Sequence, residues 1–262
     1  MDSALQQSSE FERGLLACGQ APWRGPGGLM LRRRLPLIGW HGVLSRGDVT
    51  CSDRLRTARR MGLRIVNAER AAPRILRAAG FRQILTPVHI AELPLKGDLR
   101  AAMHQKWRNR LRRAEAAGLT LRHDAWTGAP HWLIAHEVAQ RDQRRYAALP
   151  VPIVAAIARE TPGCARIVEA WEGTSPIAGM LILRHGARAT YQVGWTSERG
   201  RALNAHCLTL FEAARWLADH GHRLLELGSI ETERNPGLAR FKLGTGARAR
   251  ALGGTWLAIP GL

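Results

Sequence analysis

Residues 191–247 read YQVGWTSERGRALNAHCLTLFEAARWLADHGHRLLELGSIETERNPGLARFKLGTGA, and the order of elements in this stretch predicts the fold. A polar strand is followed by a glycine-containing turn, an amphipathic helix over 204–220, and a second strand over 224–227. This order places backbone N–H groups and a helix N-terminus at the end of a strand, where an anionic or carbonyl-bearing ligand can bind. Lys242 then follows on a later loop. The arrangement is typical of a group-transfer enzyme.

The charge of the chain indicates attraction to polyanions. Its 262 residues include 39 basic and 21 acidic ones, a net charge of +18, and 45% of them are hydrophobic, enough for a substantial core. Such a surplus favours nucleic acid, nucleotide cofactors or an anionic lipid surface as partners. Because nearly all of the surplus is arginine, a compositional bias of the genome explains it equally well. Both interpretations stay open.

Several classes of protein are disfavoured. The four cysteines are far apart and form no CxxC pair, which suits a reducing cytosol, and the ten histidines show no HExxH or other metal spacing. No apolar run is long enough to cross a bilayer, and the polar N-terminus does not resemble a signal peptide. We therefore expect a cytoplasmic protein with no metal site and no stable membrane insertion, and we leave its oligomeric state open.

Helical and strand periods alternate along the rest of the chain. Residues 1–28 look like an irregular lead-in, and a new unit begins at Asp98, a good N-cap. We expect helices over 52–61, 72–79, 99–117, 130–148 and 153–159, and strands within 29–43, 63–66, 81–90, 119–123, 165–171, 177–183 and 188–194.

Two further patterns concern organisation. Residues 55–81 and 211–246 share the order helix, glycine, strand, proline-led helical turn, glycine, a faint internal repeat. The helix after Asp98 carries six cations within fourteen residues and no acid among them. A charge run is usually a solvated face, but mutual repulsion here costs helix stability. An anion is therefore a reasonable partner for this helix.

These motifs together resemble a known family. Residues 191–247 look like the C-terminal half of the FemAB-like branch of the GNAT acyltransferases, and KWRNRLRRAEAAGL (106–119) resembles that family's basic helix. The resemblance covers about residues 30–258. It implies an α/β fold with a GNAT-like mixed sheet flanked by helices, in two tandem copies. The shortened N-terminal copy would span 1–97, and the acyltransferase domain 98–262.

The resemblance also implies a reaction, the transfer of an acyl or aminoacyl group to an amine of a small molecule or peptide. The donor would be acyl-CoA or aminoacyl-tRNA, so tRNA is a candidate partner. Ser197 stands where the usual pyrophosphate loop has Arg or Gln, which disfavours CoA. The helical arm of some peptidoglycan-directed members is absent, which disfavours tRNA. The donor therefore stays undecided between the two.

Direct attack by an amine needs a proton acceptor, a polarised carbonyl and stabilisation of the oxyanion, but no covalent enzyme intermediate. Lys242 is a rare lysine in an arginine-rich chain, and it matches the family's Phe-Lys motif. We assign candidate catalytic roles to Lys242, Glu231 and His206. Substrate-binding candidates are Tyr191, Gln192, Trp195, Asn235, Arg240, Phe241, Arg108, Asn109 and Arg112, and donor-binding candidates are Arg199, Gly200, Arg201, Ala202 and Asn204.

Two other functions compete with this one. A non-catalytic RNA- or nucleotide-binding protein on a decayed acyltransferase fold would use the basic helix and the net charge directly. A peripheral membrane enzyme acting on a lipid-linked precursor would use tryptophan at the interface, and the chain has nine. The tryptophans are scattered through expected strands and helices, which favours core packing for most of them.

Overall fold

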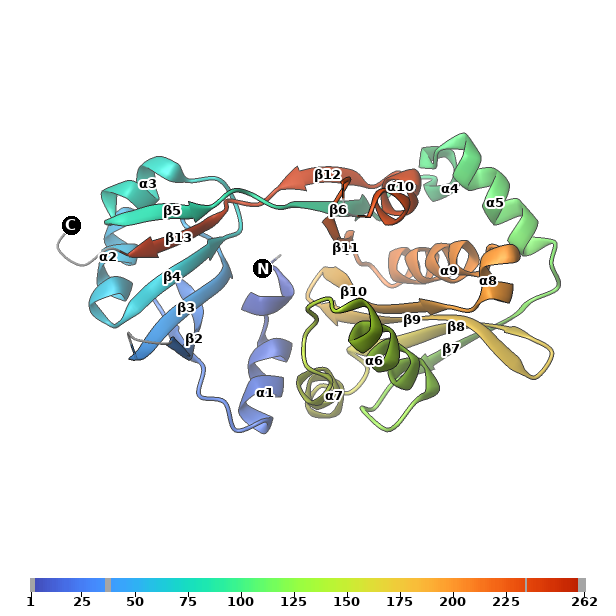
Figure 1. The fold of residues 1–262 in the computed structure, drawn as a ribbon, viewed down its shortest axis with the longest axis horizontal. Coiled ribbons are helices and arrows are strands. Elements are labelled where there is room, and N and C mark those ends of the chain that lie inside the picture. The colour runs from blue at the N-terminus through green and yellow to red at the C-terminus, as the bar shows by residue number, and fades with distance from the viewer. Residues whose placement is uncertain (1–2, 36–38, 234, 259–262) are drawn as a thin grey trace.

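Two mixed sheets flanked by helices make up the protein (Figure 1). The computed structural model describes residues 3–35, 39–233 and 235–258. In spatial order the first sheet contains β1 (Trp23–Gly25), β2 (Gly28–Leu35), β3 (Gly39–Gly47), β4 (Leu63–Ala68), β13 (Thr255–Ala258) and β5 (Phe81–Leu85). The second contains β12 (Arg248–Ala251), β6 (His89–Pro94), β11 (Leu224–Ile230), β10 (Arg188–Thr196), β9 (Ser175–His185), β8 (Ala165–Glu172) and β7 (Thr120–Ala125).

The two sheets exchange strands. After β5 the chain crosses to the second sheet, where β6 lies between β11 and β12. After β12 the chain returns, and β13 lies between β4 and β5. The sheets therefore do not divide between residues 97 and 98, where the sequence suggested a boundary. The division of the chain into two domains, over residues 1–97 and 98–262, stays a prediction.

The expected internal repeat is present in the topology. In the first unit α2 (Ser52–Arg60) connects the parallel strands β3 and β4, and α3 (Pro73–Ala78) follows. In the second unit α9 (Ala205–Asp219) connects the parallel strands β10 and β11, and α10 (Pro236–Gly244) follows. Each unit thus contains one crossover, and each has a proline at the start of its last helix. The α/β fold with two GNAT-like copies is confirmed.

Helices cover both faces of the second sheet. On one face, α9 and α5 (Gln105–Glu115) bury Leu210, Trp107 and Leu111 against the strands. On the other face, α6 (Trp132–Arg144) and α7 (Val151–Glu160) bury Leu133 and Ile157. None of the helices in the described residues is long and apolar enough to cross a membrane.

The N-terminal segment is ordered, contrary to expectation. After η1 (Leu5–Gln7), helix α1 (Ser9–Ala17) begins at Ser8, whose hydroxyl accepts a hydrogen bond from the Phe11 N–H. Leu15 of this helix is fully buried against α7. The composition of APWRGPGG predicts turns alone, but the segment contains β1 and the turn into β2. Burial against a distant helix, which local sequence does not encode, stabilises α1.

Three other elements differ from the sequence expectation. The helix expected over 99–117 is interrupted at Met103 and His104, so that α4 (Leu99–Ala102) precedes α5. Residues 81–90 form not one strand but all of β5 and the start of β6, which lie in different sheets. The Arg240-Phe241-Lys242 segment, expected on a loop, lies in α10.

A largely buried cluster of six charged side chains joins the two sheets. Arg46, at the end of β3, donates both terminal nitrogens to Glu226 of β11 at 2.9 Å and also pairs with Glu69. Arg250 of β12 bridges Glu69 and Glu92, and Arg188 of β10 pairs with Glu92 at 2.8 Å. Arginines and glutamates balance in this charge cluster. Because buried charges are costly unless paired, the contacts hold the sheets in one relative position.

We expect Glu226→Gln to destabilise the fold strongly, because it leaves Arg46 and Arg188 buried without a full counter-charge. Burial raises the pKa of Glu226, but the hydrogen bond and charge of Arg46 outweigh burial and hold it below the usual 4.5. The charged form is therefore the native one. Urea unfolding should show a loss of about 3 kcal/mol.

The matched control is Glu172→Gln, which breaks the exposed pair with Arg199. Exposed ion pairs contribute little, so its unfolding midpoint should match the parent. If both variants unfold at the parent midpoint, the charge cluster does not stabilise the fold.

Candidate active site

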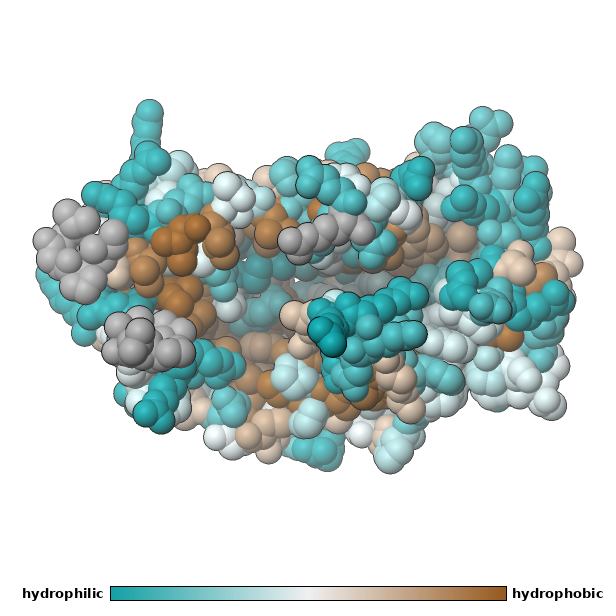
Figure 2. Space-filling view, in the orientation of Figure 1, coloured by the Kyte–Doolittle hydropathy of each residue, from teal (hydrophilic) through white to brown (hydrophobic). Residues whose placement is uncertain are grey.

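The second sheet opens between its two central parallel strands. β10 and β11 pair only at Arg188↔Leu224, Ala189↔Leu225 and Thr190↔Glu226, although β10 continues to Thr196 and β11 to Ile230. Figure 2 shows a hollow near the middle of this face, between the part with β12 and α10 and the part with α6. We call it the central hollow.

A bulge in each strand explains the separation. The register of β10 against β9 shifts between Tyr191 and Val193, so Gln192 is an extra residue. The register of β11 against β6 shifts between Glu226 and Gly228. The shift in β11 comes directly after the last pair that the strands share, Thr190↔Glu226, and the shift in β10 comes one residue later. Bulges bend a strand and increase its twist, so the two strands diverge from this level onward.

The bulge at Gln192 also overturns the expected alternation. Regular alternation along a strand would place Tyr191, Val193 and Trp195 on one face. Tyr191 instead packs with the α9 side of the sheet, whereas Val193 and Trp195 pack with the α6 side. A Cβ on Gly194 would lie 1.6 Å from the Tyr191 hydroxyl, so Gly194 is on the tyrosine's side. Tyr191 and Trp195 therefore do not line one pocket together.

Tyr191 and His206 form a buried pair at the start of the opening. The Tyr191 hydroxyl lies 2.9 Å from His206 Nε2. Burial lowers the pKa of His206 to about 4 and raises the pKa of Tyr191, so both are neutral at pH 7. His206 lies in the first turn of α9, but burial, and not the helix N-terminus, lowers its pKa. A group with this pKa is a weak base for an ammonium proton.

Phe241 connects this pair to α5. Its ring lies 5.3 Å from His206 and 6.0 Å from Trp107, centroid to centroid. The Trp107 indole N–H donates to the Phe241 carbonyl at 3.1 Å. Phe241 therefore packs between α9 and α5 and holds α10 over the opening.

Lys242 follows at the β11 side of the opening. The side chain is 6% exposed, and Nζ donates to the Ser229 carbonyl at 2.8 Å. Burial lowers its pKa to about 8, and the charges of Glu226 and Glu231 offset part of that effect. Most of the amine is thus protonated at pH 7, with a substantial neutral fraction one pH unit higher.

The remaining candidates on this side are more exposed. Glu231 follows β11 directly, and its charge acts on Lys242. Asn235 precedes α10 and makes no side-chain cap. Arg240 is exposed, with its Nε donating to the Pro236 carbonyl. Glu231 and Asn235 thus lie on the segment between Lys242 and the strand end, where an acceptor can approach.

The expected donor loop is internally satisfied. Ser197 caps α8 (Glu198–Ala202), accepting from the Gly200 N–H at 2.9 Å, and its own N–H donates to the Ile177 carbonyl. Arg199 pairs with Glu172, and Arg201 donates to the Thr196 carbonyl at 3.0 Å. Asn204 then turns the chain into α9 with φ +55°.

The Gly200 N–H is therefore already occupied in this structure. A phosphate that used this N–H would have to displace the Ser197 hydroxyl. Ala202 ends α8 and, like the rest of this loop, stays a predicted donor contact.

The basic helix divides into structural and exposed residues. Arg108 donates to the Ala101 and Met103 carbonyls and so fixes the end of α4. Asn109 and Arg112 are exposed on α5. An anion on this helix would meet Arg112 before Arg108.

Sequence reasoning missed the partners of Trp195. His136 of α6 stacks on the Trp195 indole at 4.2 Å, and Trp132 meets it edge-on at 5.6 Å. The buried Glu169 accepts from the Trp132 and Trp171 indoles. The sequence did contain a signal for these contacts, because His131, Trp132 and His136 lie close together on one expected helix. The helical period alone does not show which strand that helix contacts.

We expect Gly194→Ala to displace Tyr191, because the new methyl group would overlap the tyrosine hydroxyl. Overpacking of this kind costs about 1–3 kcal/mol. Urea unfolding and the near-ultraviolet circular dichroism of the aromatic residues measure it. Gly237→Ala is the control, since its added methyl meets open space and should change stability by under about 0.5 kcal/mol. Equal stability of the two variants would contradict this placement of the Tyr191 hydroxyl beside Gly194.

Solved structures with this fold are known. The chain is similar to the crystal structure of FemX, with a TM-score of 0.77 and 14% identity, covering 98% of this chain and 92% of that one. It is similar to the C-terminal domain of a putative lysylphosphatidylglycerol synthetase from Agrobacterium fabrum, with a TM-score of 0.61, 13% identity, and 98% and 89% coverage.

A third similar structure is L-PGS from Bacillus licheniformis, with a TM-score of 0.60 and 14% identity, covering 99% of this chain and 94% of that one. At these identities the similarity shows the fold. No curated protein matches the sequence.

The family itself is shown by the sequence. The family model of the acetyltransferase (GNAT) domain matches residues 101–244, more than half of the chain. The match includes the opened strands β10 and β11, the Tyr191–His206 pair and Lys242. The protein therefore belongs to the GNAT acetyltransferase family.

Proposed function

We propose that the protein is an N-acyltransferase that moves an acyl or aminoacyl group to an amine by direct attack. The observation that carries the proposal is the buried Lys242 amine, held at the separation of β10 and β11 within the matched domain. The nitrogen of the acceptor amine, rather than that of Lys242, attacks the carbonyl carbon of the donor. A C–N bond forms and the C–S or C–O bond to the donor breaks, while the proton that the acceptor amine loses passes to a proton acceptor of the protein and from there to the leaving sulfur or oxygen.

The open edge of β10 suits the reacting carbonyl. Beyond Thr190 this edge has no partner strand in the described structure, so its backbone groups face the central hollow. Peptide N–H groups aimed at a developing oxyanion stabilise it without reorganisation. The protonated Lys242 adds positive charge on the opposite side of the opening.

The donor is acyl-CoA or aminoacyl-tRNA. The family match supports acyl-CoA, while similarity to a lysylphosphatidylglycerol synthetase supports an aminoacyl group. The Gly200 N–H, which would usually contact a phosphate of CoA, already donates to the Ser197 hydroxyl, and this favours aminoacyl-tRNA over acyl-CoA as the donor. Tyr191 and Gln192, which follow the last paired residue of β10, and Phe241, which packs against His206, are the proposed contacts of the transferred group. Glu231 is the proposed proton acceptor.

The donor is tested by incubating the protein with labelled acetyl-CoA or labelled aminoacyl-tRNA and a mixture of amine acceptors. Transfer from one donor identifies it, and native mass spectrometry should show the same donor bound. Failure of both donors, together with RNA binding that weakens steeply with salt, would replace this proposal with a non-catalytic RNA-binding protein.

Lys242→Met should lower kcat by about two to three orders of magnitude while binding of the donor is retained, since one preorganised charge contributes about that much. The rate should fall above about pH 8, because the lysine then loses its proton. Single-turnover measurements across pH follow both effects.

Lys96→Met is the matched control, since Lys96 is an exposed lysine outside the opening. Its kcat and its pH profile should equal those of the parent. A Lys242→Met enzyme with the parent's kcat, or an unchanged rate from pH 7 to pH 10, would show that Lys242 is only structural.

A further inference from the structure

In the described part of the chain, no helix covers one face of the first sheet over β4, β13 and β5, and η1 and α1 pack only against its β2–β3 end. Helices α2 and α3 bury Met30, Leu44, Val66 and Trp256 on the opposite face. On the uncovered side, directly paired residues form a row across five strands. The row follows the register of the strands and reads Leu31, Val43, Ile65, Leu257 and Arg82.

This row is apolar and partly exposed. Val43, Ile65 and Leu257 are half-buried, and only Leu31 packs against the α1–α7 cluster. At the β5 edge, Ile84 and Leu85 are 51% and 61% exposed. Figure 2 shows hydrophobic residues gathered over β5 and β13, on the side that carries the central hollow. Exposed aliphatic side chains in a group mark an interaction surface.

Positive charge borders the row. Strands β2, β3, β4, β13 and β5 contain six arginines and neither aspartate nor glutamate. Arg46 belongs to the charge cluster. Arg33 lies at one end of the uncovered face and Arg82 at the other, and Arg32 and Arg34 are exposed beside Arg33.

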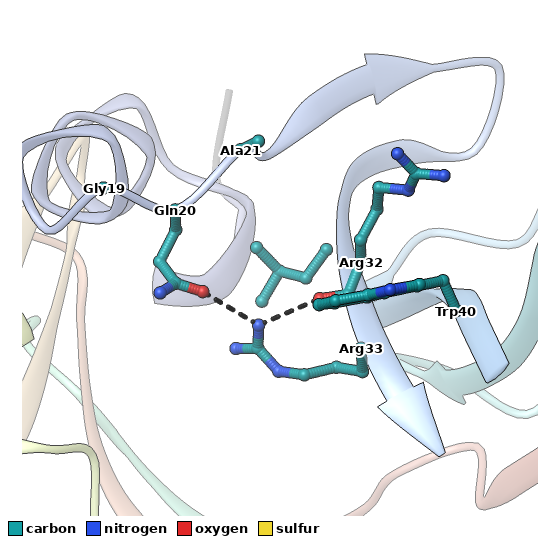
Figure 3. Close-up of a pocket in the computed structure, with 7 residues that line it drawn as sticks. Gly19, Gln20, Ala21, Arg32, Arg33 and Trp40 are labelled. Carbon is teal, nitrogen blue, oxygen red and sulfur yellow. Dashed lines mark hydrogen bonds between the residues drawn. The ribbon is translucent and has the colours of Figure 1, made fainter. Parts of the chain in front are cut away.

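A pocket of about 320 Å³ lies at the β2 end of this face (Figure 3). It is lined by Leu31, Arg33 and Trp40, together with Gln20 from the segment after α1. Arg33 donates to the Gln20 side-chain oxygen at 3.1 Å, which holds its guanidinium at the pocket. The Trp40 indole is 63% exposed. Aliphatic, indole and guanidinium groups thus meet at one edge.

We propose that this surface docks onto an anionic phospholipid bilayer. We call it the arginine-bordered face and define it by Val43, Ile65, Leu257, Leu85, Trp40, Arg33 and Arg82. Its aliphatic side chains and indole would enter the headgroup region, where tryptophan is favoured. The arginines would pair with lipid phosphates, each adding to the affinity.

Charge complementarity selects this occupant. A second copy of the chain on the same face would bring two sets of arginines together without acids, which is repulsive. A nucleic acid would use the arginines, but it would leave Ile84 and Leu85 in contact with phosphate and water. An anionic bilayer satisfies both kinds of group at once. Docking on this side would also turn the central hollow toward the lipid.

The test is co-sedimentation with vesicles of phosphatidylcholine alone and of phosphatidylcholine mixed equally with phosphatidylglycerol. We expect the parent protein to sediment with the anionic vesicles and to stay in the supernatant with the neutral ones. Arg82→Gln with Leu85→Ser, and Arg33→Gln with Trp40→Ala, should each weaken partitioning at least about fivefold, the effect of one lost arginine.

Arg60→Gln with Met61→Ser is the matched control, because both residues are exposed on the α2 side of the same sheet. It should sediment like the parent, and thermal unfolding checks that all variants fold. The proposal is overturned if the parent stays in the supernatant with anionic vesicles, or if the control loses binding equally. It is also overturned if the face variants abolish only self-association or RNA binding.

Discussion

Three arginines and three glutamates meet, largely out of water, where the two sheets exchange strands, and their pairing constrains the rest of the molecule. Arg46 and Glu69 come from the first sheet's side, and the other four members from β6, β10, β11 and β12. A buried charge that loses its partner is costly, so the hydrogen-bond geometry fixes how far apart the sheets lie. The central hollow keeps its width for the same reason.

The charge cluster also acts on the opening. Glu226 is the last residue of β11 that pairs with β10, and Gly228 and Ser229 beyond it face Lys242. One strand thus carries a structural carboxylate and the carbonyl that holds the amine. The negative charge of Glu226 opposes the loss of the lysine's proton, which burial favours. The same side chain that joins the sheets therefore tunes the group proposed to act on the substrate.

Sequence periodicity predicted most helices and strands of the second unit and the order of elements in the internal repeat, and the resemblance of motifs indicated the family. Each of these depends on neighbours within about thirty residues. It did not predict the crossing of β6 and β13, because strand order depends on contacts between distant segments. The single residue inserted at Gln192 reversed the side on which Val193 and Trp195 lie, since strand side chains alternate with a period of two. Of the site, Phe241 and Lys242 could be predicted from a motif, whereas the helix that carries them and the burial of Lys242 could not.

The reciprocal crossing has a consequence for biosynthesis. A nascent chain leaves the ribosome in order, and β4 and β5 emerge long before the strand that belongs between them. Until β13 has been translated, β4 and β5 have no partner on their facing edges, and unpaired edges invite wrong pairing. The first unit therefore cannot complete its sheet until β13 has been translated. Protection of these edges by a chaperone, or a late and concerted folding step, is a requirement of this topology.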